Sequence, residues 1–495
     1  MIYDIPLLLI VMSLISSVIC SFSGDRFSRG LCIFLVSCSL LGNGTLAAHL
    51  LSGGQSVYYM MGHFPHPWGN ELRLGMTESF MISFFSLVML LILLGGGRSI
   101  REKTEKGRRG YYHALVCLIM GSLTVLCYTN DIFTGYVFIE ISTLASAGIL
   151  FSRGTGRSIL ASVRYMIFSL VGSGLFMMGL IILYAITGYL LMPELKESVC
   201  SLYSSGTYAM PLISSAALLS IGLAVKSGLF PFHIWMSDTY SEAAPASSAI
   251  LSGLVCKGYI FLLMKIIRDV FGQDVYYGMG MNNVLFVFGV LGVIVGSVSA
   301  IREDDIFRML AFSSACQIGY VYMAAGISPL AGTAAALYQM FAHSAVKPSL
   351  FLSSDVLCAC RGDSRHFSDL TGAGYSVPLA GIVFTAGALS MIGVPATMGF
   401  VSKCLMGGAA LAASDIKKYT VLGVIALSTL LNTLYFARTV IRIYTYKDPP
   451  RAGRAGTEAQ KAFAVPGTVF ALLNLSMGIF ASFLTRVSEK FAGIL

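Results

Sequence analysis

Titratable side chains interrupt several long apolar stretches of this 495-residue sequence. They are Glu140, Lys226, His233, Lys257, His343, Lys347 and Lys403. A charge in apolar surroundings is costly, so such a group must lose its charge, find an opposite charge or face a polar interior. Groups under that constraint can take up and release protons. The sequence therefore predicts proton-transfer sites at these positions.

Glu140 and Lys226 carry the strongest indication. Glu140 lies in DIFTGYVFIEISTLASAGIL, with apolar or small residues on both sides, and Lys226 lies equally deep in ALLSIGLAVKSGLFPFHIWM. A short carboxylate at such depth cannot extend to the membrane surface, as a lysine near a helix end can. A lysine–glutamate pair whose separation changes is a proton switch, because closing the pair favours the protonated lysine and opening it releases the proton.

A break in the helix is predicted directly after Lys226. Gly228 permits a bend, and Pro231 removes one helical hydrogen bond. A broken helix at membrane depth directs free backbone groups towards a hydrated cavity. His233 lies beside the break, and two interpretations stay open: a proton relay, or a structural histidine bound to the freed carbonyls.

Downstream residues repeat this arrangement. Lys257 lies at mid-depth in SAILSGLVCKGYIFLLMKI, and His343 and Lys347 share one helical face in YQMFAHSAVKPSLFL. That face could form a proton wire; alternatively, Lys347 stabilises a kink at Pro348 by binding free carbonyls. Lys403 follows a second Gly/Pro break, GVPATMGF, and is predicted to be the terminal lysine of a second channel.

The elements that position these residues are expected to be membrane-spanning helices. The sequence is 56% hydrophobic and only 12% charged, with a mean hydropathy of +0.77. A soluble protein carries about 25% charged residues, and a spanning helix needs roughly 20 mostly apolar residues. The predicted fold class is an all-α polytopic membrane protein with about 14 transmembrane helices. The spans are placed near residues 5–22, 31–51, 77–97, 112–129, 131–151, 163–190, 211–236, 246–266, 283–300, 307–326, 332–357, 376–412, 419–441 and 464–484.

Two halves of the sequence carry similar features. Each half places a lysine on a Gly/Pro-broken helix, in the seventh and the twelfth span, after an embedded titratable group. Paired interrupted helices are typical of inverted-repeat transporters. We expect an N-terminal three-helix region over residues 1–110 and inverted five-helix repeats over 111–270 and 271–445. A loop and a C-terminal helix are expected over 446–495.

Lysine and arginine are distributed unevenly between the predicted loops. With the N-terminus outside, 21 of the 33 lie in inner loops, 8 in outer loops and 4 within spans. Because basic residues concentrate on the inner side, this bias predicts a multi-pass protein of the inner (plasma) membrane with both termini outside. The first segment is expected to be a retained span rather than a signal peptide. The net charge of +9 is located in short loops, so nucleic acid is not an expected partner.

No cofactor or metal is expected to bind this chain. The 11 cysteines are scattered, and the one close pair, in Cys358-Ala-Cys360, has no histidine or second pair at zinc-like spacing. No motif for iron–sulfur, flavin or nickel is recognisable. Whether the chain belongs to an enzyme is left open, because any redox chemistry would reside in partner subunits.

Several longer segments carry a resemblance to known proteins. The sequence contains GLAVKSGLFPFHIWMSDTYSEAAPASSAILSGLVCKGYIFLLMK, DIFRMLAFSSACQIGY, FAHSAVKPSLFL and GVPATMGFVSK. Together these segments closely resemble the proton-conducting antiporter-like family over most of residues 110–410. That family includes the A-type and D-type proteins of Mrp antiporters, the large membrane subunits of complex I and the matching subunits of membrane-bound hydrogenases. The segment YYMMGHFPHPWGNELRLGMTES resembles the branch of the D-type Mrp proteins and the hydrogenases more than the complex I branch.

The resemblance implies a role for each predicted site. It pairs Glu140 with Lys226, relays protons through Lys257, His343 and Lys347, and places the exit near Lys403. It implies a subunit that translocates protons, with or without exchange for sodium, in an Mrp-type antiporter or a redox-driven complex related to complex I. The expected partners are the lipid bilayer, other membrane subunits such as small Mrp-like subunits and, in the redox setting, hydrogenase or oxidoreductase subunits.

Three alternatives stay open beside this interpretation. The first is a quinone-linked antiporter-like subunit of complex I, and the second is a membrane scaffold that does not conduct ions. A scaffold, however, has no need for two interrupted spans that each carry a lysine. The third is an enzyme acting on lipid or quinone, for which no nucleophile–base arrangement is recognisable.

Overall fold

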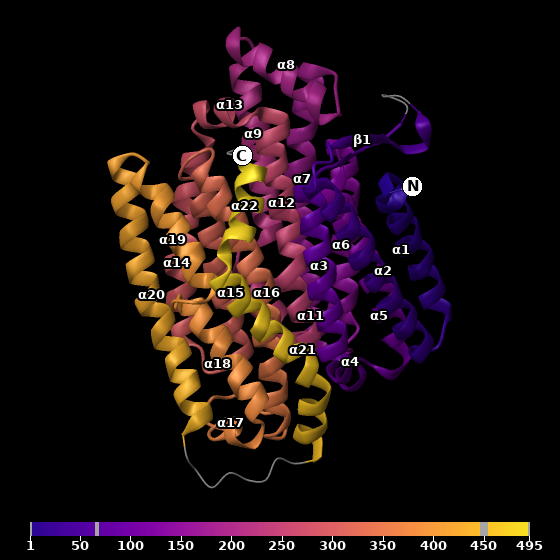
Figure 1. Cartoon of the computed structure of the whole chain (residues 1–495), viewed down its shortest axis with the longest axis vertical. Helices are drawn as coiled ribbons and strands as arrows, with labels where there is room; N and C mark the ends of the chain where they lie inside the picture. The colour runs from indigo at the N-terminus through magenta and orange to yellow at the C-terminus, as the bar shows by residue number, and fades with distance from the viewer. Residues whose placement is uncertain (1, 65–68, 446–453, 494–495) are drawn as a thin grey trace.

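A computed structural model describes residues 2–64, 69–445 and 454–493 of the chain. The helices run roughly along the long axis of the molecule and form one bundle (Figure 1). Within the described residues, 11 helices are long and apolar enough to cross a membrane. The predicted polytopic helical fold is therefore confirmed. Of the loop and C-terminal helix predicted over 446–495, residues 446–453 lie outside the described residues.

The N-terminal region contains three long helices and a small sheet. Its elements are η1 (Ile2–Asp4), α1 (Ile5–Phe22), α2 (Asp25–Leu51), β1 (Val57–Met60), η2 (Met61–His63), β2 (Glu71–Leu74), α3 (Met76–Gly95), α4 (Gly97–Lys103) and η3 (Lys106–Arg108). The two strands pair antiparallel, with Val57 opposite Leu74. This two-stranded hairpin is a small addition to the predicted helical fold, and the β-branched and aromatic residues of Val57–Met60 favour a strand there.

The first half of the core begins with α5. Its elements are α5 (Arg109–Tyr128), α6 (Ile132–Phe151), α7 (Gly156–Thr187), α8 (Met192–Ser204), α9 (Ala209–Ser227), α10 (Ile234–Glu242), α11 (Pro245–Ile250), η4 (Leu251–Val255), α12 (Cys256–Ile266) and η5 (Ile267–Phe271). The predicted break in the seventh span is confirmed between α9 and α10. The eighth span has an unpredicted feature: η4 and η5 are π-helical and flank α12.

The second half of the core contains the other broken helix. Its elements are α13 (Gln273–Gly278), α14 (Met281–Arg302), α15 (Ile306–Ala325), α16 (Ala331–Ala359), α17 (Ala373–Ser376), α18 (Pro378–Ile392), α19 (Met398–Leu411), α20 (Asp415–Tyr444), α21 (Arg454–Ile479) and α22 (Ala481–Ala492). The predicted break in the twelfth span is confirmed between α18 and α19. The last span differs from its predicted bounds, because α21 begins at Arg454 and the chain turns at Phe480 into α22.

Two core helices begin at aspartate caps. The Asp131 carboxylate accepts a hydrogen bond from the Thr134 amide at the start of α6. The Asp305 carboxylate accepts from the Phe307 and Arg308 amides at the start of α15. Because the first turn of a helix leaves amides without partners, these aspartates determine where each helix begins.

Glycines bring two pairs of helices into backbone contact. A Cβ atom at Gly222 of α9 would lie 2.7 Å from the carbonyl oxygen of Gly172 on α7. A Cβ atom at Gly319 of α15 would lie 2.6 Å from the amide nitrogen of Val293 on α14. Small residues permit such approach between membrane helices, which otherwise gain little from burying apolar surface in lipid. The α7–α9 and α14–α15 pairs therefore interlock along their lengths.

The two ends of the bundle differ in their helices. α4 and α17 lie at one end, whereas α8 and α13 lie at the other, together with the start of α1 and the end of α22 (Figure 1). The predicted location of the termini outside the cell stays a prediction. One part of the loop assignment was wrong: Lys265 and Arg268 were counted in an outer loop, but they lie in the span Pro245–Phe271. Lys265 is fully buried.

Candidate functional site

The first broken helix places Lys226 in the interior. α9 ends at Ser227 because Gly228 adopts a left-handed conformation with φ +78°. A Cβ atom at Gly228 would clash with the Met236 sulfur, so the turn has no space for a larger residue. The carbonyl of Val225 accepts from the Gly228 amide at 3.2 Å and from the Trp235 indole at 3.4 Å. Residues of the break itself therefore cap the end of α9, and Lys226 is buried in its last turn.

Lys226 is paired with Glu140 across the gap between α9 and α6. The lysine nitrogen lies 3.3 Å from the Glu140 carboxylate and donates to the Thr143 hydroxyl at 2.8 Å. Ser173 of α7 also donates to the Glu140 carboxylate. The Lys226 side chain is fully buried, whereas the Glu140 side chain is 23% exposed. The carboxylate therefore links a buried amine to the flank of the bundle.

Hydroxyl groups continue from this pair to α12. Thr143 lies 3.4 Å from the hydroxyl of Tyr259, which donates to Ser142 at 3.3 Å. The nitrogen of Lys226 lies 5.8 Å from the centre of the Tyr259 ring, a favourable position for a cation. Tyr259 stands two residues after Lys257 on the same helix.

Lys257 and Lys347 are linked through the α15 helix. Lys257 donates to the carbonyl of Ser252, which the π-helical turn η4 places next to it. The hydroxyls of Ser252 and Ser314 lie 3.0 Å apart, and Ser314 donates to the Leu310 carbonyl at 2.9 Å. Lys347 donates to that same carbonyl at 2.9 Å. Both lysines are fully buried.

Three polar residues on one face of α16 extend this series of contacts beyond Lys347. Gln339, His343 and Lys347 follow one another at one-turn spacing along this helix, and all three are buried. Gln339 donates to Gln317 at 2.6 Å and accepts from Ser402 at 2.5 Å. Within the described part of the chain, neither ring nitrogen of His343 has a hydrogen-bond partner. His343 thus has free proton-binding capacity between two polar contacts.

The second broken helix places Lys403 at the other end of this series. α18 ends where Gly393 adopts φ +92°, and the Lys403 side chain crosses the break. Its nitrogen donates to the Ile392 carbonyl at 2.6 Å and to Thr429 at 2.8 Å. Among the described residues, no carboxylate lies within ion-pair distance of Lys403. Its side chain is only partly buried, so this end of the series also reaches the flank of the bundle.

Asn474 of α21 holds the second break together. Its side-chain oxygen accepts from the Ser390 hydroxyl at 2.8 Å and from the Met398 amide at 3.4 Å. Its amide nitrogen donates to the Ala386 carbonyl at 3.2 Å. Asn474 is 3% exposed. One neutral side chain therefore satisfies groups on both sides of the break.

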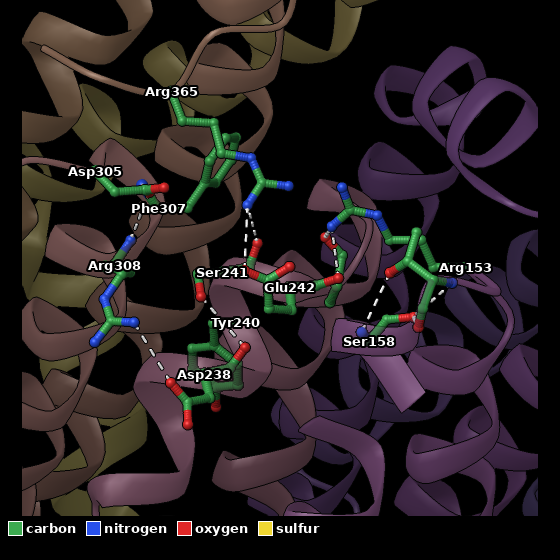
Figure 2. Close-up of polar contacts among 12 residues, drawn as sticks. Arg153, Ser158, Asp238, Tyr240, Ser241, Glu242, Asp305, Phe307, Arg308 and Arg365 are labelled. Carbon is green, nitrogen blue, oxygen red and sulfur yellow. Dashed lines mark hydrogen bonds and ion pairs between the residues drawn. The ribbon is translucent and has the colours of Figure 1, made fainter. Parts of the chain in front are cut away.

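Charged groups surround the far end of α10, beyond the first break. The Asp238 carboxylate forms an ion pair with Arg308 of α15 at 3.5 Å (Figure 2). It also forms an ion pair with Arg164 of α7, so one arginine comes from each half of the core. Arg308 also contacts Glu303 at 3.1 Å. The Asp238 carboxylate thereby ties α10 to both halves of the molecule.

Two further arginines bind the last carbonyls of α10. Arg153 donates to the Glu242 carbonyl at 2.5 Å, and Arg365 donates to the Ser241 carbonyl at 2.6 Å (Figure 2). Arg365 also lies 5.5 Å above the ring of Phe307. Burial and the neighbouring Arg365 charge lower the pKa of Arg153, although Glu242 opposes the shift. Cations at a helix C-terminus are favourable, so α10 ends where the arginines bind it.

These arginines line a cleft of about 1010 Å³ at the surface. The loops 153–157, 302–308 and 363–366 form its walls, together with Glu242. Arginines and carboxylates are balanced in this lining, which makes the cleft polar without a strong preference for anions or cations. It gives water access to the end of α10.

The structure brings six of the seven predicted residues into one series. We call this series the central polar path, and it comprises Glu140, Lys226, Thr143, Tyr259, Lys257, Ser252, Ser314, Lys347, His343, Gln339, Ser402 and Lys403. Hydrogen bonds, or one-turn spacing on α16, connect most of its members. Tyr259 and Lys257, and likewise Ser402 and Lys403, are close in sequence but share no hydrogen bond in the described structure. The transport roles predicted for these residues stay predictions.

His233 is the predicted residue that lies apart from the central polar path. Its ring stands between those of Phe230 and Phe312, with centroids 5.7 and 6.3 Å away. It is 7% exposed, and among the described residues its Nδ1 atom has no hydrogen-bond partner. The His233 ring does interact with the backbone of Pro231, so the structural interpretation stays open beside the proton relay. The alternative role of Lys347, in which it binds a carbonyl freed by Pro348 in its own helix, is not what the structure shows, because this lysine binds a carbonyl of α15.

Sequence reasoning missed the neutral members of the path. Thr143, Tyr259, Ser252 and Ser314 resemble many other hydroxyl residues of membrane helices, and nothing in their local sequence distinguishes them. Gln339 did carry a signal, because it precedes His343 by one turn on the same face. Among the described residues, no group of three or more metal-ligating side chains is present.

Comparisons with known proteins agree with this architecture. The family model described as NADH:quinone oxidoreductase/Mrp antiporter, TM, matches residues 129–430, which is more than half of the chain. A polytopic membrane subunit with two broken helices and buried lysines is the class that the fold and site define. The chain belongs to the NADH:quinone oxidoreductase/Mrp antiporter family of membrane proteins.

Relatives occur in two kinds of system. The chain is 29% identical over 479 residues to the N-type subunit of NADH-quinone oxidoreductase from Desulforudis audaxviator. This alignment covers 92% of this chain and 91% of that protein. It is 25% identical over 456 residues to the D-type subunit of the Na(+)/H(+) antiporter from Bacillus subtilis, covering 90% and 88%. Its fold matches a chain of the membrane-bound sulfane sulfur reductase, an archaeal respiratory membrane complex, with a TM-score of 0.87 and 22% identity over 99% and 97% of the chains.

Proposed function

We propose that this chain is a proton-translocating subunit of a multisubunit membrane complex. The observation that carries the proposal is the central polar path between the two broken helices. Lys226, Lys257 and Lys347 are buried, and Lys403 is partly buried. Among the described residues, Glu140 is the carboxylate partner of Lys226, and the other three lysines bind neutral groups. Buried ionisable groups of this kind mark ion pathways in membrane proteins.

The Glu140–Lys226 pair acts as the switch at one end of the path. While the pair is closed, the carboxylate stabilises the protonated lysine. When the two groups separate, the buried amine loses that stabilisation and its proton passes to Thr143 and Tyr259, which lie within hydrogen-bond range of each other. Lys257, Lys347 and His343 then hold the proton in turn, and Lys403 releases it at the second break.

Proton transport is tested with two buried lysines that bind carbonyls in different places. Lys347 lies on the path, whereas Lys265 binds the Cys127 and Thr129 carbonyls at the end of α5. The complex that contains the chain is reconstituted in vesicles with a pH-sensitive dye. Lys347→Met should lower proton transport at least about tenfold, since methionine cannot carry a proton. Lys265→Met, the matched control, should keep transport per assembled complex; equal transport in wild type and Lys347→Met would refute the path.

Two settings remain for such a subunit, and each is favoured by a relative. The Bacillus subtilis relative named as a Na(+)/H(+) antiporter subunit favours exchange of protons for sodium under an ion gradient. The relative named as an NADH-quinone oxidoreductase subunit favours a redox-driven pump. We propose to separate the two by purifying the intact complex and measuring its iron and nickel. Small membrane subunits without metal indicate an antiporter, and iron–sulfur subunits indicate a redox-driven complex.

A further inference from the structure

A small basic cavity of about 260 Å³ lies far from the central polar path. It is located where α2 and α5 begin and where α3 passes into α4. Its charged lining consists of Arg26, Arg29, Arg101 and Arg109, with Asp25 as the one carboxylate. Four positive groups against one negative group give the cavity a strong preference for an anion.

The lining contains polar groups that the protein itself does not satisfy. Asp25 lies 3.6 Å from Arg109 and 3.9 Å from Nε2 of His113, so it accounts for only part of the positive charge. His113 is 2% exposed, and within the described residues its Nδ1 atom and the Nε atom of Arg109 have no hydrogen-bond partner. Buried polar atoms usually have partners, so these two atoms leave unfilled hydrogen-bonding capacity in residues that line the cavity.

The backbone leaves room for an anion to approach the arginines. The Arg29 guanidinium lies against Gly97, where a Cβ atom would come within 2.6 Å of its terminal nitrogen and displace the side chain. Gly97 is itself buried and opens α4. A planar guanidinium held in this way presents paired donors to phosphate oxygens.

The surroundings identify the source of the phosphate. The cavity lies at the ends of helices that are long and apolar enough to cross a membrane, where the headgroups of a bilayer are expected. Beside it, the apolar side chains of Phe22, Phe27 and Phe34 are 89%, 61% and 57% exposed on α1 and α2. Such a surface contacts acyl chains, and basic pockets at helix ends bind anionic headgroups. A phospholipid supplies both the phosphate and the chains, whereas free phosphate would leave these rings unmatched.

We propose that the cavity lined by Arg26, Arg29, Arg101, Arg109 and His113 binds the phosphate of an anionic phospholipid. The arginines neutralise the headgroup, His113 Nδ1 shares a hydrogen bond with a phosphate oxygen, and the acyl chains lie along α1 and α2. The bound lipid joins the starts of α2 and α5 to the end of α3. It thereby stabilises the N-terminal region without entering the transport path.

Two charge-matched double variants test the proposal. Arg26→Gln/Arg101→Gln removes two exposed charges from the cavity, and Lys106→Gln/Lys461→Gln removes two exposed charges elsewhere. The intact complex is stripped of loosely bound lipid and titrated with phosphatidylglycerol or phosphatidylcholine, and bound lipid is counted by native mass spectrometry. A basic residue near a headgroup contributes roughly fivefold to affinity, so the cavity variant should bind phosphatidylglycerol about 25-fold more weakly. The control variant should match wild type.

Each alternative occupant gives a different result. Equal phosphatidylglycerol binding by both double variants, or equal binding of phosphatidylcholine by wild type, would overturn the proposal. Displacement of phosphatidylglycerol by millimolar inorganic phosphate would assign the cavity to a free anion instead. If an acidic segment of a partner subunit fills the cavity, the intact complex retains no phosphatidylglycerol there and the cavity variant loses that partner; this result also overturns the proposal.

Discussion

The two broken helices solve the same structural problem with different chemistry. At the first break, Lys226 meets the Glu140 carboxylate, and arginines from both halves hold the far end of α10. At the second break, Lys403 meets a carbonyl and a hydroxyl, and the neutral Asn474 holds both sides. In the part of the chain that the structure describes, therefore, an ion pair holds the lysine in place only at the first break. A change of protonation there alters an attraction, whereas at the second break it alters only which hydrogen bonds Lys403 can donate.

The sharpest test removes the charge from the first break while keeping its shape. Glu140→Gln should lower proton transport at least about tenfold, because the buried Lys226 loses its one carboxylate partner. Glu140→Asp keeps the charge and should recover part of the activity. Transport is measured as dye quenching in vesicles that contain the assembled complex. Wild-type transport in Glu140→Gln would contradict the claim that the first break needs its ion pair.

A second test disrupts the neutral break. Asn474→Leu leaves the Met398 amide and the Ser390 hydroxyl without a buried partner, which should destabilise the protein by about 2–3 kcal/mol. The loss should be the same at low and high salt, since no charge is removed. Thermal unfolding of the purified complex gives the measurement. Asn283→Leu, at an exposed position of α14, is the matched control and should stay near wild type.

The smallest effect is expected at α10. Asp238→Asn weakens partly exposed ion pairs with Arg164 and Arg308 and should cost about 0.5–1 kcal/mol. Because salt screens such pairs, the difference from wild type should shrink at high ionic strength. Asp415→Asn breaks an exposed pair with Lys418 on a single helix and is the control. A loss in Asp238→Asn that is unchanged by salt would mean that α10 is held by packing instead.

The sequence was sufficient to predict the helical class and both broken helices. Apolar runs of spanning length identify membrane helices, and Gly228, Pro231 and Gly393 identify breaks, because these signals are local. The position of Glu140, Lys226, Lys257, Lys347 and Lys403 within apolar runs also predicted their depth in the membrane. The pairing of Glu140 with Lys226 could not be predicted from the residues, because the two are 86 positions apart and meet only in the tertiary structure, where α7 packs against both α6 and α9.

Other features depended on tertiary structure and could not be predicted. The π-helical turn at Leu251–Val255 places the Ser252 carbonyl beside Lys257, but no residue in that turn is specific to π-helices. Gly253 is explained only by its neighbour, since a Cβ atom there would lie 2.5 Å from Pro348. The burial of Lys265 was missed because a lysine near a predicted helix end normally extends to the surface.

The glycine contacts between α7 and α9 and between α14 and α15 limit how the protein can move. Helices whose backbones touch at Gly222 and Gly319 cannot slide past one another without a steric clash, so each pair moves as a rigid body. We therefore expect displacement at the short non-helical segments 228–233 and 393–397, which lie at the two breaks. Such hinges permit only a short stroke, and a lysine on a flexible stem of four methylenes can span the remaining distance by rotation of its side chain. Protons would therefore advance through rotamer changes of the carriers while the surrounding scaffold keeps its shape.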